Sequence, residues 1–382
     1  VSMRKTIFFD LEGPLSPQDN AYEVMKGIGE KGASIFEVIS KYDDIISIEG
    51  REGYEPGDTL ALIVPFLLLH GITETDIKAV SERAKIVEGA KELIGLLQAE
   101  NWDIYIISTS YEYHAYDVGR KLGIEPGRII CTNLSLKLLR KVLSTNFLKK
   151  FDQKKASQLR EKNALPKKYL YTVKKAEEDI IELYSHIDKP EPIVNRLDDF
   201  FFHQLPALGY NIFDTRVVGG ERKAEALREI AKDKGEAISN VIAVGDSITD
   251  YKMLNEVATH GGLSVVFNGN EYAVPYANVG LASVDMRFLY PLCAAFARGG
   301  KGEAMDVATK WEDNRDVFEK NPSDIPDDCI TADIRDFVTS QKSPFPYFHN
   351  LEHADARRNL EEIIKIHKQM RMRVREDAGK LG

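Results

Sequence analysis

Short apolar segments that end in polar or small residues occur three times along the chain, and they predict its core. They are TIFFD at 6–10, DIYIIS at 103–108 and NVIAVGD at 240–246. Apolar runs of this length are typical of strands that are buried on both faces of a parallel sheet. Helical patterns precede the second and third runs, at 87–101 and 221–235. The alternation predicts an α/β fold with a doubly wound, Rossmann-like parallel sheet.

A polar side chain stands at the end of each predicted strand. These residues are Asp10, Ser108 and Asp246. In doubly wound sheets, ligands bind outside the carboxyl ends of the strands. We therefore expect three distant segments to converge on one site.

The remaining sequence is inserted between the core segments or follows them. We expect an α/β core from 1–16, 86–134 and 216–286, a mainly helical cap insertion at 17–85, a second cap insertion at 135–215 and a helical C-terminal extension at 287–382. The second insertion begins with a basic stretch, because 134–175 holds thirteen Lys or Arg against two acids. This stretch is either a solvated helical face or a surface that attracts an anionic substrate or partner.

The C-terminal extension ends in a helical pattern at 351–375. One stripe of this helix carries Leu360, Ile363, Ile364, His367 and Met370. Docking on the core and pairing between two subunits would explain such a stripe equally well. A homodimer through the C-terminal helix is thus one expectation.

Composition excludes several classes of protein. The net charge of −9 argues against nucleic acid as a partner. The three cysteines form no CxxC motif, and the N-terminal residues contain no apolar signal core, so we expect a cytoplasmic protein. The longest apolar run, at 60–69, is about half the roughly 20 residues that a membrane span needs. We interpret it as a buried helix and expect no membrane partner.

Two pairs of acids are the main candidates for chemistry. Asp10 and Glu12 follow the first strand directly, and Asp246 and Asp250 have an i, i+4 spacing after the third. Like charges at close range raise each other's pKa, so such groups cost free energy unless a cation or a reaction uses them. A small carboxylate site of this kind suits Mg²⁺.

Four motifs occur in a particular order: DLEGPL at 10–15, IISTS at 106–110, Lys223 within GGERKAEAL, and VGDSITD at 244–250. Together they resemble the haloacid dehalogenase superfamily, in its phosphoserine-phosphatase-like branch. The resemblance covers roughly 4–16, 86–133 and 216–285. It implies a Mg²⁺-dependent phosphohydrolase that acts on a small phosphorylated metabolite.

The resemblance assigns the nucleophile to Asp10, which would form an aspartyl-phosphate. Glu12 would be the general acid for the leaving group and then the base for water. Aspartate is the usual residue at this position, although DxEG occurs in some branches of the superfamily. Pro14 stands where Thr is commoner, which removes a hydroxyl near the site.

The other roles follow the same resemblance. Asp246 would bind the metal directly with the Asp10 carboxylate and the Glu12 carbonyl, and Asp250 would act through water or by orienting Lys223. Lys223 would balance the charge of the phosphate and the nucleophile.

Ser108 would donate its hydroxyl to the phosphate, helped by the N–H groups of Thr109 and Ser110 at the start of a helix. Substrate selectivity would lie in residues after the phosphate-binding turn and the metal motif, each of which could equally be a packing or turn residue: Tyr111, Tyr113, His114, Asn268 and Asn270.

Three alternatives stay open at this point. A phosphotransferase would use the same intermediate with an alcohol in place of water. A binding or regulatory protein could retain the fold without turnover. The segment HNLEH at 349–353 has the spacing of a two-histidine zinc site, although surface histidines on a helix are the preferred interpretation.

Overall fold

The computed structural model describes residues 5–151, 164–341 and 344–382, with the side chains of 146–151 excepted. Its centre is a seven-stranded sheet with the order β3-β2-β1-β4-β5-β6-β7. All neighbouring strands are parallel except β6 and β7. The strands are β1 (Thr6–Phe9), β2 (Asp103–Tyr111), β3 (Ile129–Thr132), β4 (Val241–Gly245), β5 (Leu263–Phe267), β6 (Val279–Ala282) and β7 (Tyr347–Asn350). The predicted doubly wound α/β fold is confirmed.

Helices cover both faces of the sheet. Alternate residues of β1 point to opposite faces, so each face presents apolar side chains that must be buried. Ile7 and Phe9 pack into one apolar cluster and Phe8 into another. The helices on the first face include α6 (Ala90–Ala99), α7 (Glu112–Lys121) and α15 (Tyr290–Lys320). Those on the second face include α13 (Glu221–Asp233), α14 (Tyr251–Thr259) and α18 (Leu360–Arg375). The two helices expected before β2 and β4 correspond to α6 and α13.

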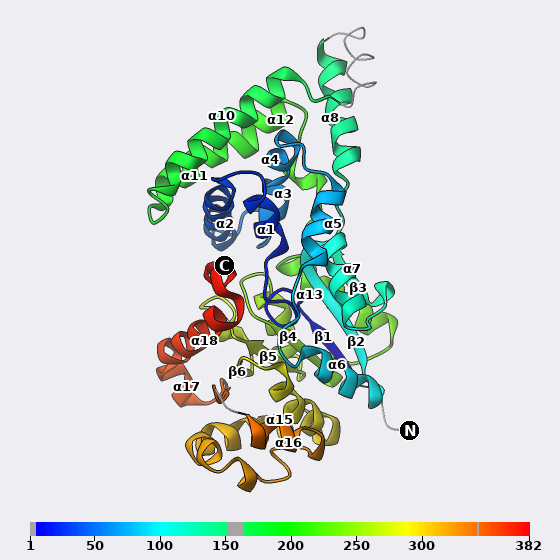
Figure 1. The fold of residues 1–382 in the computed structure, drawn as a ribbon, viewed down its shortest axis with the longest axis vertical. Coiled ribbons are helices and arrows are strands. Elements are labelled where there is room, and N and C mark those ends of the chain that lie inside the picture. Colours follow the sequence, from blue (N-terminus) through cyan, green and yellow to red (C-terminus); the bar gives the residue numbers. More distant parts are fainter. Residues whose placement is uncertain (1–4, 152–163, 342–343) are drawn as a thin grey trace.

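The two insertions share one hydrophobic cluster and lie together above the sheet (Figure 1). Aromatic contacts join them: Tyr42 stacks on Phe201 at 5.7 Å between centroids, and Phe66 lies 5.9 Å from Phe200. The first insertion contributes α1 (Asn20–Lys26), α2 (Gly32–Ile48), α3 (Thr59–Leu62), α4 (Val64–Leu69) and α5 (Glu74–Glu82). The second contributes α8 (Leu136–Phe151), α10 (Lys167–Tyr184), α11 (Pro190–Asp199), the π-helix η2 (Phe200–Gln204) and α12 (Leu205–Ala207). We call this joint body the cap.

The apolar run at 60–69 forms α3 and α4, which are buried in the cap. Across the described ranges, no single helix is long and apolar enough to cross a membrane, although the bent pair Thr59–Leu69 and Glu74–Glu82 meets the length and composition test. Part of the basic stretch expected at 134–175 lies outside the described residues.

The C-terminal extension is not purely helical. It contains α16 (Ala332–Ser340) and α17 (Ala354–Arg358), but also β7, which completes the sheet as its antiparallel edge strand. His349 lies in β7 and His353 directly precedes α17, so the interpretation of these two histidines as a surface pair on one helix is wrong. On α18, Ile363, His367 and Met370 are buried, which shows that the stripe docks within the chain. The homodimer through this helix stays a prediction.

Short 3-10 segments link the larger elements: η1 (Pro126–Arg128), η3 (Ile212–Asp214), η4 (Ile238–Asn240), η5 (Val274–Tyr276), η6 (Met286–Leu289), η7 (Pro322–Asp324) and η8 (Glu376–Lys380). The last of these places the C-terminal residues between α18 and the cap (Figure 1).

Candidate active site

Three carboxylates gather at the carboxyl end of the sheet. Asp10 follows β1, Asp246 follows β4, and Asp250 directly precedes α14. One oxygen of each lies within 4.8 Å of the others, and all three residues are buried. The register explains the meeting, because β1 and β4 are hydrogen-bonded neighbours and the Asp10 N–H donates to the Val244 carbonyl at 2.8 Å.

Lys223 of α13 lies between two of these acids. Its Nζ donates to Asp10 Oδ1 at 2.6 Å and to Asp250 Oδ1 at 2.7 Å, and the side chain is buried. Burial alone would lower the pKa of Lys223, but the two carboxylates outweigh it and raise the pKa. Burial and the nearby Asp250 raise the pKa of Asp10 to about 8, against the opposing effect of Lys223.

Asp250 is held in place by its second oxygen. Its Oδ2 accepts from the N–H groups of Asp246 at 2.9 Å and Ser247 at 3.1 Å. Both Asp250 oxygens are therefore engaged, one by Lys223 and the other by the backbone of the turn. This agrees with a role in orienting Lys223.

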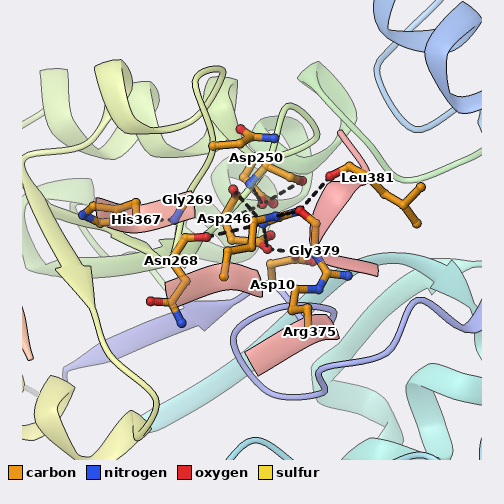
Figure 2. Close-up of polar contacts among 12 residues, drawn as sticks. Asp10, Asp246, Asp250, Asn268, Gly269, His367, Arg375, Gly379 and Leu381 are labelled. Atoms are coloured by element: carbon orange, nitrogen blue, oxygen red, sulfur yellow. Dashed lines mark hydrogen bonds and ion pairs between the residues drawn. The ribbon is translucent and has the colours of Figure 1, made fainter. Parts of the chain in front are cut away.

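Two arginines of α18 contact the remaining acid (Figure 2). Arg371 Nη1 donates to Asp246 Oδ2, and Arg375 Nη1 donates to the same oxygen at 3.0 Å. Arg371 also donates to the Gly379 and Leu381 carbonyls at 2.9 and 3.0 Å. These two arginines are not among the site residues predicted from the sequence. A signal was present, since the stripe through His367 continues at i+4 to Arg371 and then to Arg375.

The donor set fits a hard divalent cation such as Mg²⁺. Asp246 Oδ1 is buried and makes no hydrogen bond to any described residue. A buried carboxylate oxygen without a partner is costly, and a cation would satisfy it. Gly13 permits the close packing here: its φ is +114°, and a Cβ atom at this position would lie 2.1 Å from Asp246 Oδ2. Asp10 and Asp250 each place one carboxylate oxygen within 4.8 Å of an oxygen of Asp246.

Glu12 lies at the edge of the acid cluster, beside His114. Its Oε1 accepts from the Asn20 N–H at 2.8 Å and lies 3.4 Å from His114 Nε2. Burial and the charge of Asp19 raise the pKa of Glu12 well above its usual value. Burial lowers the pKa of His114 to about 3, so this imidazole is neutral. A buried carboxyl that retains its proton at neutral pH is suited to general acid chemistry.

The segment after β2 differs from the expectation. The strand continues to Tyr111 and α7 begins at Glu112, so the N–H groups of Thr109 and Ser110 do not lie at the start of a helix. Ser108 Oγ accepts from the Ser110 N–H at 3.1 Å and lies 2.6 Å from Ser110 Oγ. The Thr109 hydroxyl is buried and has no partner in the described part of the chain.

Asn268 does not offer its side chain to a ligand in this structure. Its Nδ2 donates to the Ser283 carbonyl at 2.7 Å, and its Oδ1 accepts from the Ser283 N–H at 2.8 Å. Both ends of the amide thus join the loop after β5 to the end of β6. Similarly, Tyr111 is buried in the cap cluster and donates to the Leu60 carbonyl.

A cavity of about 70 Å³ lies over Asp10. The core, the cap and the C-terminal segment all line it, with residues that include Asp10, Glu12, Asp43, Asp44, Gly57, Thr109, Arg371, Arg375 and Leu381. The three acids themselves are buried, and Asp10 contributes to the lining of this cavity.

Comparison with known proteins agrees with the geometry. Residues 72–283, more than half of the chain, match the haloacid dehalogenase-like hydrolases. The chain belongs to this family, which confirms the resemblance found in its motifs.

The fold is shared with a solved structure that aligns over the whole chain. The gene product AF1437 from Archaeoglobus fulgidus aligns over 100% of this chain and 99% of its own, with a TM-score of 0.72 and 25% sequence identity. A substrate-bound phosphoserine phosphatase is 16% identical with a TM-score of 0.46, over 76% of this chain and 98% of its own. A phospho-aspartyl intermediate analogue of phosphoserine phosphatase is 17% identical with a TM-score of 0.45, over 75% and 97%. A search of curated proteins gave no match.

Proposed function

We propose that the protein is a Mg²⁺-dependent phosphohydrolase that acts on a small phosphorylated metabolite through a covalent intermediate on Asp10. The observation that carries the proposal is the buried cluster of Asp10, Asp246 and Asp250 around Lys223 at the carboxyl end of the sheet. Membership of a hydrolase family supports it.

The first half of the reaction would use Asp10 and Glu12. An Asp10 carboxylate oxygen attacks phosphorus, and the bond between phosphorus and the leaving oxygen breaks. Glu12 donates its proton to that oxygen, which departs as an alcohol. Lys223 balances the charge on Asp10, and Asp250 holds Lys223 in position.

The second half regenerates the enzyme. Water attacks the phosphorus of the aspartyl-phosphate while Glu12 accepts its proton, and the bond between phosphorus and Asp10 breaks to release inorganic phosphate. Asp10, Asp246 and the Glu12 carbonyl would hold Mg²⁺, which supplies positive charge to phosphate oxygens when bound. Thr109 lines the same cavity as Asp10 and its hydroxyl has no partner among the described residues, so it is a better candidate than the paired Ser108 to contact the phosphate.

The cap would control access to this chemistry. The cap and the C-terminal segment line the cavity of about 70 Å³ over Asp10. A substrate larger than its phosphate group therefore requires the cap to move before it binds. Exclusion of water would follow when the cap closes.

A screen of phosphorylated metabolites for phosphate release, with and without Mg²⁺, tests the proposal. The matched control is Asp10→Asn, which keeps the size of the side chain but removes the nucleophile. We expect metal-dependent release that falls at least about 10³-fold in the variant. Equal release by both proteins would contradict the proposal and favour a binding protein, whereas transfer of phosphate to an added alcohol would identify a phosphotransferase.

A further inference from the structure

The two oxygens of Asp246 have different environments. Oδ2 contacts both Arg371 and Arg375, whereas Oδ1 is buried without a hydrogen-bond partner among the described residues. The arginines thus hold the carboxylate by one oxygen and leave the other for an ion. An arrangement that blocked the ion would occupy both oxygens.

The arginines also change the charge of the cluster. In the ionised form of the cluster, which is the form that binds a cation, Asp10, Asp246 and Asp250 carry three negative charges, and Lys223 alone would leave two for a divalent ion to neutralise. The two guanidinium groups supply those two positive charges before any ion arrives. In a buried site, where unbalanced charge is costly, an ion alone would add two positive charges and a phosphate dianion alone two negative ones. Binding of both together preserves the balance.

The guanidinium groups are held in place by their own surroundings. Arg371 donates to two carbonyls of the C-terminal segment, and Arg375 Nε donates to the Pro17 carbonyl at 3.1 Å. Ala378 and Leu381 of the same segment pack into the cap cluster. These hydrogen bonds orient the arginines without a ligand.

We propose that Arg371 and Arg375 are positioning residues that hold Asp246 and make the divalent ion and the phosphate group of the substrate bind as a pair. The proposal rests on the proposed function, because it takes the acid cluster as the ion site. Each ligand should raise the affinity for the other by the same factor.

The test is calorimetric titration of the full-length chain with Mg²⁺, with and without saturating inorganic phosphate. For the unmodified protein, we expect phosphate to lower the apparent Kd for Mg²⁺ at least about tenfold. In Arg375→Gln and Arg371→Gln, we expect Mg²⁺ alone to bind at least as tightly as before and the phosphate effect to fall below about threefold. Arg371→Lys, which keeps the charge, should recover part of the effect.

Arg373→Gln is the matched control, because Arg373 lies on the same helix but is exposed. It should behave like the unmodified protein. Circular dichroism establishes whether each variant is folded. If Arg371→Gln does not fold, Arg375→Gln and Arg371→Lys still test the inference.

Three outcomes would overturn the inference. One is an unmodified protein whose Mg²⁺ affinity does not respond to phosphate. The second is a variant that loses Mg²⁺ affinity equally with and without phosphate, which would mean that the arginines only maintain structure. The third is a variant that gains Mg²⁺ affinity equally in both conditions, which would mean that the arginines only compete with the ion. Because the titration measures binding, intact coupling without phosphate release would refute the proposed function alone.

Discussion

The two sides of the acid cluster have opposite ratios of cations to carboxylates. We call them the lysine side, formed by Lys223, Asp10 and Asp250, and the arginine side, formed by Asp246, Arg371 and Arg375. On the lysine side, one cation is shared by two carboxylates. On the arginine side, two cations share one carboxylate. The cluster therefore has excess negative charge at one end and excess positive charge at the other.

The two sides also come from different parts of the chain, the lysine side from the core and the arginine side in part from the C-terminal extension. The lysine side uses three core segments that the family motifs identify, and burial with the nearby Asp250 raises the pKa of Asp10. The arginine side depends on α18, which carries none of the motifs that resemble the family. The C-terminal extension thus takes part in the electrostatics of the site as well as in packing.

The largest expected difference between the two sides is in stability. Lys223→Met leaves two buried carboxylates without a cation, so we expect the free energy of unfolding to fall by about 3–5 kcal/mol. Arg375→Met leaves Asp246 paired with Arg371, and we expect a loss of about 2 kcal/mol. Urea unfolding of both variants in a metal-free buffer measures the difference. Equal losses would show that the two sides are not distinct.

An intermediate effect concerns two buried histidines, His367 on α18 and His349 on β7. His367 Nδ1 accepts from the Gly269 N–H at 3.1 Å, and its Nε2 lies 3.3 Å from His349 Nδ1. Burial, with the charge of Arg315, lowers the pKa of His349 to about 4. Burial and His349 lower the pKa of His367 well below its usual value. The helix that carries the arginines is thus docked through a pair of neutral imidazoles.

Acid should therefore weaken this docking. An unfolded histidine binds a proton near pH 6.5, but folded His349 does so only near pH 4. Between these values the unfolded chain binds more protons, so the free energy of unfolding falls as the pH is lowered. Between pH 6.5 and 5.5 we expect a loss of about 1 kcal/mol per histidine.

Comparison with His349→Gln isolates this contribution. Burial raises the pKa values of Asp43 and Asp44 to about 7 and 8, which gives an opposite pH dependence. These acids are present in both proteins and cancel in the difference. Urea unfolding at the two pH values should show a smaller acid-induced loss in the variant, and an unchanged loss would contradict the assignment.

The smallest effect is expected from the surface contact of the C-terminal segment. Lys380 Nζ lies 2.8 Å from Glu37 Oε1 on the cap, but the lysine side chain is 44% exposed. Exposed ion pairs of this kind contribute little, so Lys380→Gln should lower the free energy of unfolding by less than about 0.5 kcal/mol. A loss above about 1 kcal/mol in urea unfolding would mean that the surface pair, and not the buried arginines, holds the segment to the cap.

Local patterns were sufficient for the core and for the position of the acids at one edge of the sheet, whereas the role of Lys223 came from the resemblance to the family. Each apolar run becomes a strand, and an acid that follows a strand of a parallel sheet must lie at its carboxyl edge. This is why Asp10 and Asp246 could be expected to meet although they are far apart in sequence. Patterns were insufficient to predict which partner a side chain binds when two are possible. Asn268 was expected at the substrate, but the close approach of β6 places Ser283 against its amide.

The sequence by itself determined the parallel sheet, the helices before β2 and β4, and the position of the acids at one edge, because these follow from periodicity and chain order. Only the tertiary structure decided that the two insertions form one cap, that β7 completes the sheet, and that α18 directs Arg371 and Arg375 at Asp246. The physical reason is that a helical pattern specifies which face is buried but not the surface on which it is buried. An arginine on a buried stripe acquires its role only from the carboxylate that the fold brings to meet it.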